Sequence, residues 1–332
     1  MKKKILLLST GGTIASVSSE YGLLPGQSGA DLLATLGPLP YDVTVQDILR
    51  LDSTNIQPEE WQYIATRVYE MRAGYDGVVI THGTDTMAYT ASMLTFMLPG
   101  IDLPVVLTGS QLPISNPLSD APYNLRCALK MAASGRPGIF IAFDRKILLG
   151  CRSVKVRTTG FDAFESVKAP AVAVIDSDGL RFTDALPPHP APACELRTKL
   201  DSRVMLFKLI PGIDPALFRA IAMAGCRGLV VEAFGSGGLN FIRRDVVSAM
   251  GDLVASGIPV VVCSQCLYER SDMTKYEVGR RALDQGVIPG EDMTSECAVT
   301  KLMWALGQGM KPDEIAEFFQ TSVAGEVTPK AR

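Results

Sequence analysis

Short apolar runs alternate with amphipathic stretches along the first half of the chain. The apolar runs predict buried strands at residues 5–8, 43–49, 78–80, 105–107 and 139–143. Between them, apolar side chains recur three and four positions apart and predict helices at residues 58–72, 85–98 and 119–133. Strands that alternate with helices predict an α/β fold, with crossover connections that cover both faces of a sheet.

A proline-dense stretch interrupts this alternation. Pro187, Pro188, Pro190 and Pro192 lie close together and cannot form a central strand, so residues 184–202 are predicted to be a linker. Beyond it the alternation resumes, with strands predicted at 204–209, 228–233 and 259–263 and helices at 215–224, 243–255, 295–306 and 313–320. The pattern predicts two α/β domains of unequal size, at residues 1–183 and 203–332.

Composition and charge narrow the classes of function. The chain has 332 residues, of which 47% are hydrophobic and 20% charged, and its net charge is −3. That charge gives no electrostatic reason to expect binding to nucleic acid or to an anionic membrane. The apolar runs are too short for a secretion signal or a membrane span. Seven cysteines, an odd number, favour reduced thiols and a cytoplasmic location.

Two loops that contain glycine and hydroxyl side chains carry the strongest chemical pattern. Residues 10–15 (Thr-Gly-Gly-Thr-Ile-Ala) and 81–86 (Thr-His-Gly-Thr-Asp-Thr) each follow a predicted strand. Loops at the carboxyl ends of parallel strands share one edge of a sheet. We therefore expect Thr13, Thr84 and Asp85 to lie in one cleft, where two hydroxyls and a carboxylate are typical of a nucleophile site.

Several other kinds of site are disfavoured. The chain has only two histidines, His82 and His189, which argues against a serine–histidine–acid triad and against a histidine-rich metal site. It has no phosphate-binding Gly-Lys-Ser/Thr loop, and the lone pair Cys263 and Cys266 is predicted to be two free thiols. No cofactor is therefore expected.

Hydrolysis without histidine or metal requires another base. A lysine that its surroundings hold neutral can serve, with a threonine as the nucleophile. Lys155, which follows the last strand and turn pattern of the first domain, is the candidate. Three residues also have a structural alternative: Lys155 as a surface strand residue, and Thr13 and Asp85 as helix caps. His82 is predicted to be a hydrogen-bonded structural residue and not a base.

The two loops resemble the two signatures of the bacterial-type L-asparaginase family. The similarity also covers residues 108–111, 160–166, 210–212 and 293–302, and it is closest to the cytoplasmic type I branch. This resemblance implies a two-domain asparaginase/glutaminase-like fold. A larger N-terminal parallel-sheet domain would carry the catalytic residues, and a smaller C-terminal α/β domain would follow.

The resemblance also implies roles for individual residues. Thr13 would attack the side-chain amide carbon of the substrate, Lys155 would accept the proton of Thr84, and Asp85 would bind the α-amino group. Gly83 and Thr84 would line the substrate, and backbone N–H groups near Gly12 and Thr84 would stabilise the oxyanion.

The resemblance extends to a second substrate-binding segment. Asp52, Ser53 and Thr54 stand where family members bind the α-carboxylate and α-amino groups of the substrate. A serine hydroxyl and backbone N–H groups suit a carboxylate, and the Asp52 carboxylate suits an ammonium group.

One catalytic position departs from the family pattern. Family members place a tyrosine in a mobile loop shortly after the nucleophile, and in this branch it often follows a glycine. Here Leu23 follows Gly22, and the tyrosine is Tyr21. We take Tyr21 as the lid residue, because it lies in a polar stretch between segments that contain glycine.

The resemblance predicts an L-asparaginase that converts asparagine and water to aspartate and ammonia through an acyl-enzyme on Thr13. Its partners would be a small amino-acid substrate and further copies of itself, as a homodimer or homotetramer. One alternative is the amidase component of a tRNA-dependent amidation complex, but such components carry an extra N-terminal domain, for which a nucleophile motif at residue 10 leaves no room. The other is a catalytically silent amino-acid-binding protein, which the intact set of Thr13, Thr84, Asp85 and Lys155 disfavours.

Overall fold

The computed structural model describes residues 2–20, 22–184 and 193–328. The chain divides into two compact units, Met1–Thr198 and Lys199–Arg332. Within the predicted linker, residues 185–192 lie outside the described residues.

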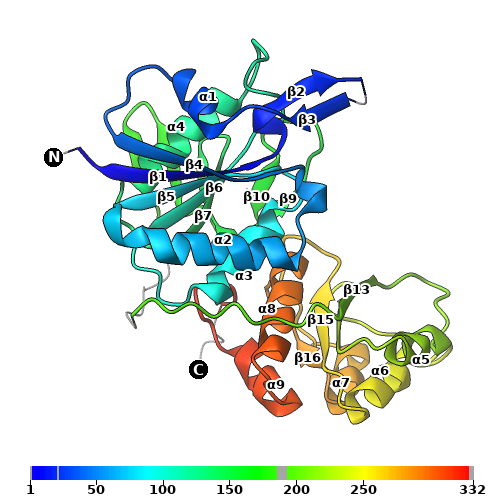
Figure 1. Ribbon diagram of the computed structural model, residues 1–332. Helices are drawn as coiled ribbons and strands as arrows, with labels where there is room; N and C mark the ends of the chain where they lie inside the picture. The colour runs from blue at the N-terminus through cyan, green and yellow to red at the C-terminus, as the bar shows by residue number, and fades with distance from the viewer. Residues whose placement is uncertain (1, 21, 185–192, 329–332) are drawn as a thin grey trace. The chain divides into compact units, whose positions relative to one another are not determined.

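The first unit is built on an eight-stranded sheet with the order β12-β11-β8-β7-β6-β5-β1-β4 (Figure 1). Five strands are parallel to one another: β1 (Lys4–Gly11), β4 (Asp42–Leu51), β5 (Gly77–Thr81), β6 (Pro104–Thr108) and β7 (Gly138–Phe143). Three antiparallel strands extend it: β8 (Lys146–Leu149), β11 (Ala173–Asp176) and β12 (Gly179–Phe182). The predicted parallel sheet is therefore mixed, because a tight turn at Asp144 and Arg145, both with positive φ, reverses the chain after β7.

Helices cover both faces of this sheet. Figure 1 shows α1 (Gly29–Ala34) and α4 (Ala121–Ala132) on one face, with α2 (Pro58–Met71) and α3 (Met87–Met97) on the other. All residues of β5 and β6 are buried as a result. The sequence begins α2 locally, because Pro58 occupies its first turn and the Glu60 carboxylate accepts the Gln57 N–H.

Two predictions for this unit were wrong in detail. Residues 43–49 were expected to form a buried strand, but β4 is the last strand of the sheet and none of its residues is fully buried. The helix predicted from Asp85 begins at Met87. The Asp85 N–H donates to Ser53 Oγ and the Thr86 hydroxyl donates to the Ser53 carbonyl, so these residues are held by a neighbouring loop and not by the helix.

The sequence pattern did not predict the short elements of this unit. Strands β2 (Ser16–Ser19) and β3 (Gly22–Pro25) form a hairpin, and β9 (Ser153–Lys155) pairs with β10 (Phe164–Ser166). Short 3₁₀ turns follow three strands: η1 (Thr13–Ala15), η2 (Ser53–Asn55) and η4 (Gly150–Arg152). Segments of three or four residues are too short to show a clear hydrophobic period.

The second unit contains a four-stranded parallel sheet in sequential order. Its strands are β13 (Val204–Lys208), β14 (Gly228–Ala233), β15 (Val260–Ser264) and β16 (Ile288–Pro289). Helices α5 (Ala216–Met223), α6 (Val246–Ala255) and α7 (Glu277–Asp284) pack in series, α8 (Ser295–Gly307) contacts three of the strands, and α9 (Pro312–Gln320) follows. The sequence pattern did not predict α7, which is short and largely polar, or the two-residue strand β16.

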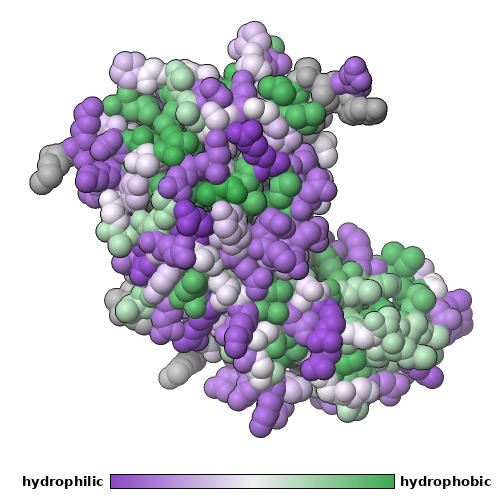
Figure 2. All heavy atoms as spheres, in the orientation of Figure 1, coloured by the Kyte–Doolittle hydropathy of each residue, from purple (hydrophilic) through white to green (hydrophobic). Residues whose placement is uncertain are grey.

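Exposed apolar side chains gather on the second unit over β13 and α5 (Figure 2). Met205 and Leu206 of β13 are 40% and 37% exposed, and Leu217 and Met223 of α5 are 48% and 89% exposed. Among the described residues, no helix is both long enough and apolar enough to cross a membrane.

Candidate active site

The sheet of the first unit has a topological switch point between β1 and β5. The chain leaves β1 toward β4 and leaves β5 toward β6, although β1 and β5 are neighbours. In open α/β sheets, ligands bind outside the carboxyl ends of the strands at such a point. The described strands of the second unit form no equivalent point, because they follow one another in order.

Three loops meet at this edge with their backbones in direct contact. A Cβ atom on Gly12, whose φ is 77°, would lie 2.4 Å from the Gly83 nitrogen. A Cβ atom on Gly83 would lie 2.5 Å from Ser53 Oγ. Only glycine fits at these two positions, and the loops after β1, β4 and β5 pack together as a result.

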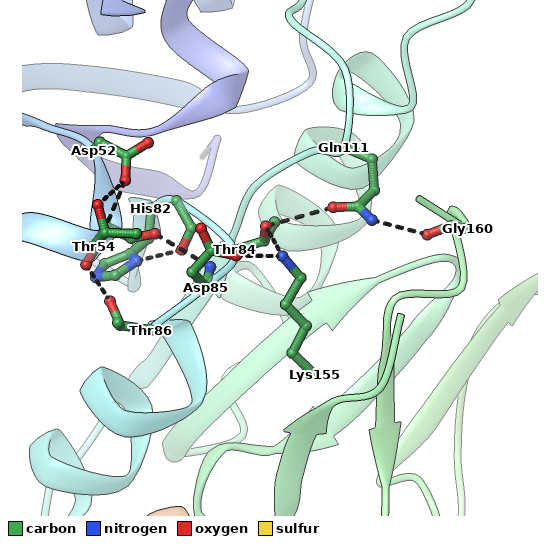
Figure 3. A network of polar contacts seen from close by, with 11 residues as sticks. Asp52, Thr54, His82, Thr84, Asp85, Thr86, Gln111, Lys155 and Gly160 are labelled. Carbon is green, nitrogen blue, oxygen red and sulfur yellow. Dashed lines mark hydrogen bonds and ion pairs between the residues drawn. The ribbon is translucent and has the colours of Figure 1, made fainter. Parts of the chain in front are cut away.

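Thr84, Asp85 and Lys155 form one polar group at this edge (Figure 3). Lys155 Nζ donates to Thr84 Oγ1 at 2.8 Å and to Asp85 Oδ1 at 2.6 Å. The Thr84 residue is 5% exposed, whereas the side chains of Lys155 and Asp85 are 17% and 53% exposed. The hydroxyl is therefore sheltered beside the amine, and the carboxylate remains open to a ligand.

The segment 52–54 lies against the same group. Ser53 is buried, and its Oγ accepts the Asp85 N–H at 3.2 Å, so its own hydroxyl proton is left to donate. Asp52 Oδ1 accepts from the Thr54 N–H at 2.9 Å and from the Thr54 hydroxyl at 2.7 Å. In this structure Asp52 therefore caps the η2 turn.

Thr13 begins the 3₁₀ turn η1, directly after the buried Gly12. The turn is held by the Ser16 hydroxyl, which donates to the Gly12 carbonyl at 3.0 Å. The Gly12 N–H donates to the Leu51 carbonyl at 2.9 Å and is thus unable to serve an oxyanion. The N–H groups of Thr13 and Thr84 have no acceptor among the described residues, which leaves them as the available donors. Tyr21 lies outside the described residues.

Gln111 also belongs to this group. It lies in the segment 108–111 of the family similarity, but no role was predicted for it. Its Oε1 lies 3.4 Å from Thr84 Oγ1, and its Nε2 donates to the Gly160 carbonyl at 3.1 Å (Figure 3). Asp120 accepts the backbone N–H of Gln111 and so fixes the loop. Gln111 could have been predicted as a site residue, because it is a polar residue just after the predicted strand 105–107 and that strand ends at the same edge of the sheet.

His82 is a hydrogen-bonded structural residue, as predicted. The residue is fully buried, its Nδ1 lies 2.7 Å from the Gly83 carbonyl, and its Nε2 lies 2.9 Å from Thr90 Oγ1. Burial lowers the pKa of His82 to about 4, so the ring is neutral near pH 7. No three histidine, cysteine, aspartate or glutamate side chains in the described parts of the chain come together as a metal site.

The buried His82 is expected to make the protein sensitive to acid. Its pKa is about 4 in the folded state and 6.5 in the reference state, so the unfolded chain takes up a proton first as the pH falls. The free energy of unfolding should therefore decrease between these pH values, by up to about 3 kcal/mol from this group. Urea unfolding of the wild type and of His82→Asn, measured from about pH 7 down to about pH 4, checks this. A wild type and a variant with the same pH slope would assign the acid sensitivity to other groups.

Comparisons with known proteins assign both units to the same family. Residues 4–187 match the family model for "Asparaginase, N-terminal", and residues 203–319 match the "Glutaminase/Asparaginase C-terminal domain". The chain is 45% identical over 334 residues to an L-asparaginase of Thermococcus kodakarensis, with 98% of this chain and 99% of that protein covered. It is also 35% identical over 342 residues to a component of the glutamyl-tRNA(Gln) amidotransferase of the same organism, with 99% of this chain and 77% of that component covered.

Solved structures show the same similarity. The thermostable L-asparaginase from Thermococcus kodakarensis matches with a TM-score of 0.93 at 45% identity, covering 98% of this chain and 100% of the other. L-asparaginase I from Vibrio cholerae matches with a TM-score of 0.87 at 28% identity, covering 99% and 100%. A probable cytoplasmic L-asparaginase from Campylobacter jejuni matches with a TM-score of 0.82 at 27% identity, covering 97% and 100%.

Proposed function

This chain belongs to the asparaginase family, and from that premise we propose that it is an L-asparaginase, an amidohydrolase that converts L-asparagine and water to L-aspartate and ammonia. The observation that carries the proposal is the contact of Lys155 Nζ with both Thr84 Oγ1 and Asp85 Oδ1 at the switch point of the sheet. A hydroxyl beside a lysine and an open carboxylate can support both catalysis and recognition of an amino acid.

In the proposed reaction, Thr13 Oγ1 attacks the side-chain amide carbon of asparagine. The negative oxygen of the tetrahedral intermediate would accept hydrogen bonds from the N–H groups of Thr13 and Thr84, which have no acceptor among the described residues. The amide nitrogen gains a proton and leaves as ammonia, which yields an ester between Thr13 and the aspartyl group. Water then hydrolyses this ester, releasing aspartate and restoring the Thr13 hydroxyl.

Lys155 and Thr84 would supply the base. The lysine amine accepts the Thr84 proton, and the Thr84 oxygen in turn takes a proton from the attacking group. In the structure Lys155 donates to Asp85 at 2.6 Å. A substrate ammonium bound to Asp85 would compete for that carboxylate, and a positive charge placed nearby favours the neutral amine.

The same residues suit the two charges of the substrate. The half-exposed Asp85 carboxylate would bind the α-ammonium group, with Asp52 nearby as a second anion. The Ser53 hydroxyl and the N–H groups around it would bind the α-carboxylate, while Thr54 and Gly83 shape the walls. Tyr21 would close over the nucleophile as the lid residue.

We extend the proposal to assembly and location. The apolar surface over β13 and α5 supports association with further copies of this chain, as a homodimer or homotetramer. The similarity to a probable cytoplasmic L-asparaginase supports a cytoplasmic location. No cofactor is required for the chemistry described.

A second candidate function is the amidase step of a tRNA-dependent amidotransferase. The 35% identity to a glutamyl-tRNA(Gln) amidotransferase component over 342 residues favours it. An amidase of that kind would release its ammonia within a complex, whereas an asparaginase acts alone on free asparagine. The two functions are therefore separated by assaying the chain by itself.

The test is a measurement of ammonia release by the purified chain with asparagine, with glutamine and with buffer alone. We expect turnover of free asparagine without any partner protein. The two amides differ by one methylene, which is worth only about 1–3 kcal/mol in a pocket, so some glutamine turnover is compatible with the proposal. No release from asparagine, or release only after a partner protein is added, would contradict it.

A further inference from the structure

A buried chain of hydrogen bonds runs from helix α2 to the peptide that joins Gly83 and Thr84. The Trp61 indole N–H of α2 donates to Thr90 Oγ1 of α3 at 3.0 Å. Thr90 Oγ1 lies 2.9 Å from His82 Nε2, and His82 Nδ1 lies 2.7 Å from the Gly83 carbonyl oxygen. Trp61, Thr90 and His82 are all buried, so water does not compete for these bonds.

The direction of every bond in this chain is determined by its ends. An indole N–H can only donate and a carbonyl oxygen can only accept. His82 Nδ1 must therefore carry the ring proton and donate it to Gly83. Because the ring is neutral, His82 Nε2 accepts, and it accepts from the Thr90 hydroxyl, whose oxygen is the acceptor for Trp61.

This chain of bonds orients the peptide plane between Gly83 and Thr84. The described residues contain no cis peptide bond, so the Thr84 N–H points away from the Gly83 carbonyl. The carbonyl is held on the buried side by the imidazole, and the N–H therefore faces the opposite side. No acceptor for this N–H lies within the described parts of the chain.

Gly83 needs such an anchor. A glycine has no Cβ atom to restrict its backbone, and here glycine is required because Ser53 Oγ would lie 2.5 Å from a Cβ atom. The residue that lets the loops pack thus also has a backbone that is less restricted than that of other residue types. A rigid ring that holds the carbonyl removes that freedom.

We propose that His82 is a positioning residue that, with Thr90 and Trp61 behind it, aims the Thr84 N–H at the oxyanion of the reaction. The proposal rests on the asparaginase function proposed above. His82 touches neither the substrate nor the reacting atoms, and it acts only through the Gly83–Thr84 peptide. Loss of a whole oxyanion donor costs about 100- to 1000-fold in kcat, so partial misalignment of this one should cost less.

The test replaces Thr90, which is linked to the Gly83–Thr84 peptide through two hydrogen bonds, by way of His82. Thr90→Val keeps the shape of the side chain and removes the hydroxyl, so we expect kcat for asparagine to fall about tenfold while KM changes less than about twofold. Thr90→Ser restores the hydroxyl and should recover most of kcat. Thr95→Val is the matched control, because Thr95 is a buried threonine of the same helix whose hydroxyl donates only to the Ala91 carbonyl.

A second readout does not depend on activity. The chain has only two histidines, so nitrogen-15 labelling of histidine gives two rings, and the His82→Asn variant identifies which one is His82. We expect His82 to be protonated at Nδ1 and neutral at about pH 6 in the wild type. The Thr90→Val substitution should shift its Nε2 resonance. If Thr90→Val does not fold, Thr90→Ala, which removes the same hydroxyl together with a methyl group, takes its place in both measurements.

The outcomes separate this inference from the function on which it rests. A wild type without asparaginase activity contradicts the proposed function, and the nitrogen resonances then report the tautomer alone. An active wild type in which Thr90→Val keeps its full kcat overturns the positioning role. A His82 ring protonated at Nε2 overturns it as well, because that tautomer cannot donate to the Gly83 carbonyl.

Discussion

Replacing Thr13 by alanine is expected to lower kcat for asparagine hydrolysis by at least about a thousandfold, with no change in fold. The reason is that in the proposed reaction Thr13 supplies the oxygen that bonds to the substrate, and loss of a nucleophile removes the covalent pathway. Thr13 begins the η1 turn, which is held by hydrogen bonds from Ala15 N and Ser16 Oγ to the Gly12 carbonyl. Neither bond involves the Thr13 side chain, so the loop should keep its shape. Steady-state kinetics and thermal unfolding of the purified variant check both expectations.

The control for this substitution is Thr35→Ala. Thr35 caps helix α1, and its hydroxyl donates to the Leu32 carbonyl at 2.7 Å. Loss of a hydroxyl at a helix end costs about 1 kcal/mol or less in stability and should leave the rate unchanged. If Thr13→Ala behaves like this control and retains more than about a tenth of the wild-type rate, Thr13 is not the nucleophile.

Lys155→Arg is expected to be nearly as damaging as Lys155→Met, and both should lose at least about a hundredfold in kcat/KM. The methionine variant removes the amine. The arginine variant keeps a positive charge beside Asp85, but a guanidinium is not deprotonated in proteins and cannot accept the Thr84 proton. The contacts of 2.8 Å and 2.6 Å around Lys155 Nζ also leave little room for a planar group.

The matched control is Lys130→Arg, at an exposed position of helix α4, which should be neutral for activity and stability. Substantial activity in Lys155→Arg, with Lys155→Met inactive, would mean that the residue acts only as a positive charge. The base would then have to be another group at the carboxyl edge of the sheet.

Local pattern predicted the main helices and strands of both units, and it did so for a physical reason. Fully buried strands such as β5 and β6 are continuous apolar runs, and α2 has a clear helical period, so neighbouring residues carry enough information. The same pattern was misleading for β4, because whether a strand lies in the centre or at the edge of a sheet depends on the rest of the chain. The short strands β9 and β10 were missed, although β9 carries Lys155.

For the candidate site, the sequence by itself determined which loops come together at the ends of strands. The two glycine loops follow β1 and β5, and neighbouring parallel strands present their carboxyl ends at the same edge. This much follows from strand order along a doubly wound sheet, and it was sufficient to predict that Thr13, Thr84 and Asp85 lie at one edge.

Only the tertiary structure decided the contacts between side chains that are distant in sequence. Lys155 contacts Thr84, 71 positions away in the sequence, and Gln111 contacts the same hydroxyl. The tautomer of His82 is determined by the Gly83 carbonyl on one side of the ring and the Thr90 hydroxyl on the other. A hydrogen bond requires distances correct to a few tenths of an ångström, whereas hydrophobic periodicity specifies only which face of an element is buried. The positions of these donors and acceptors are set by how whole elements pack, and that is a property of the folded chain.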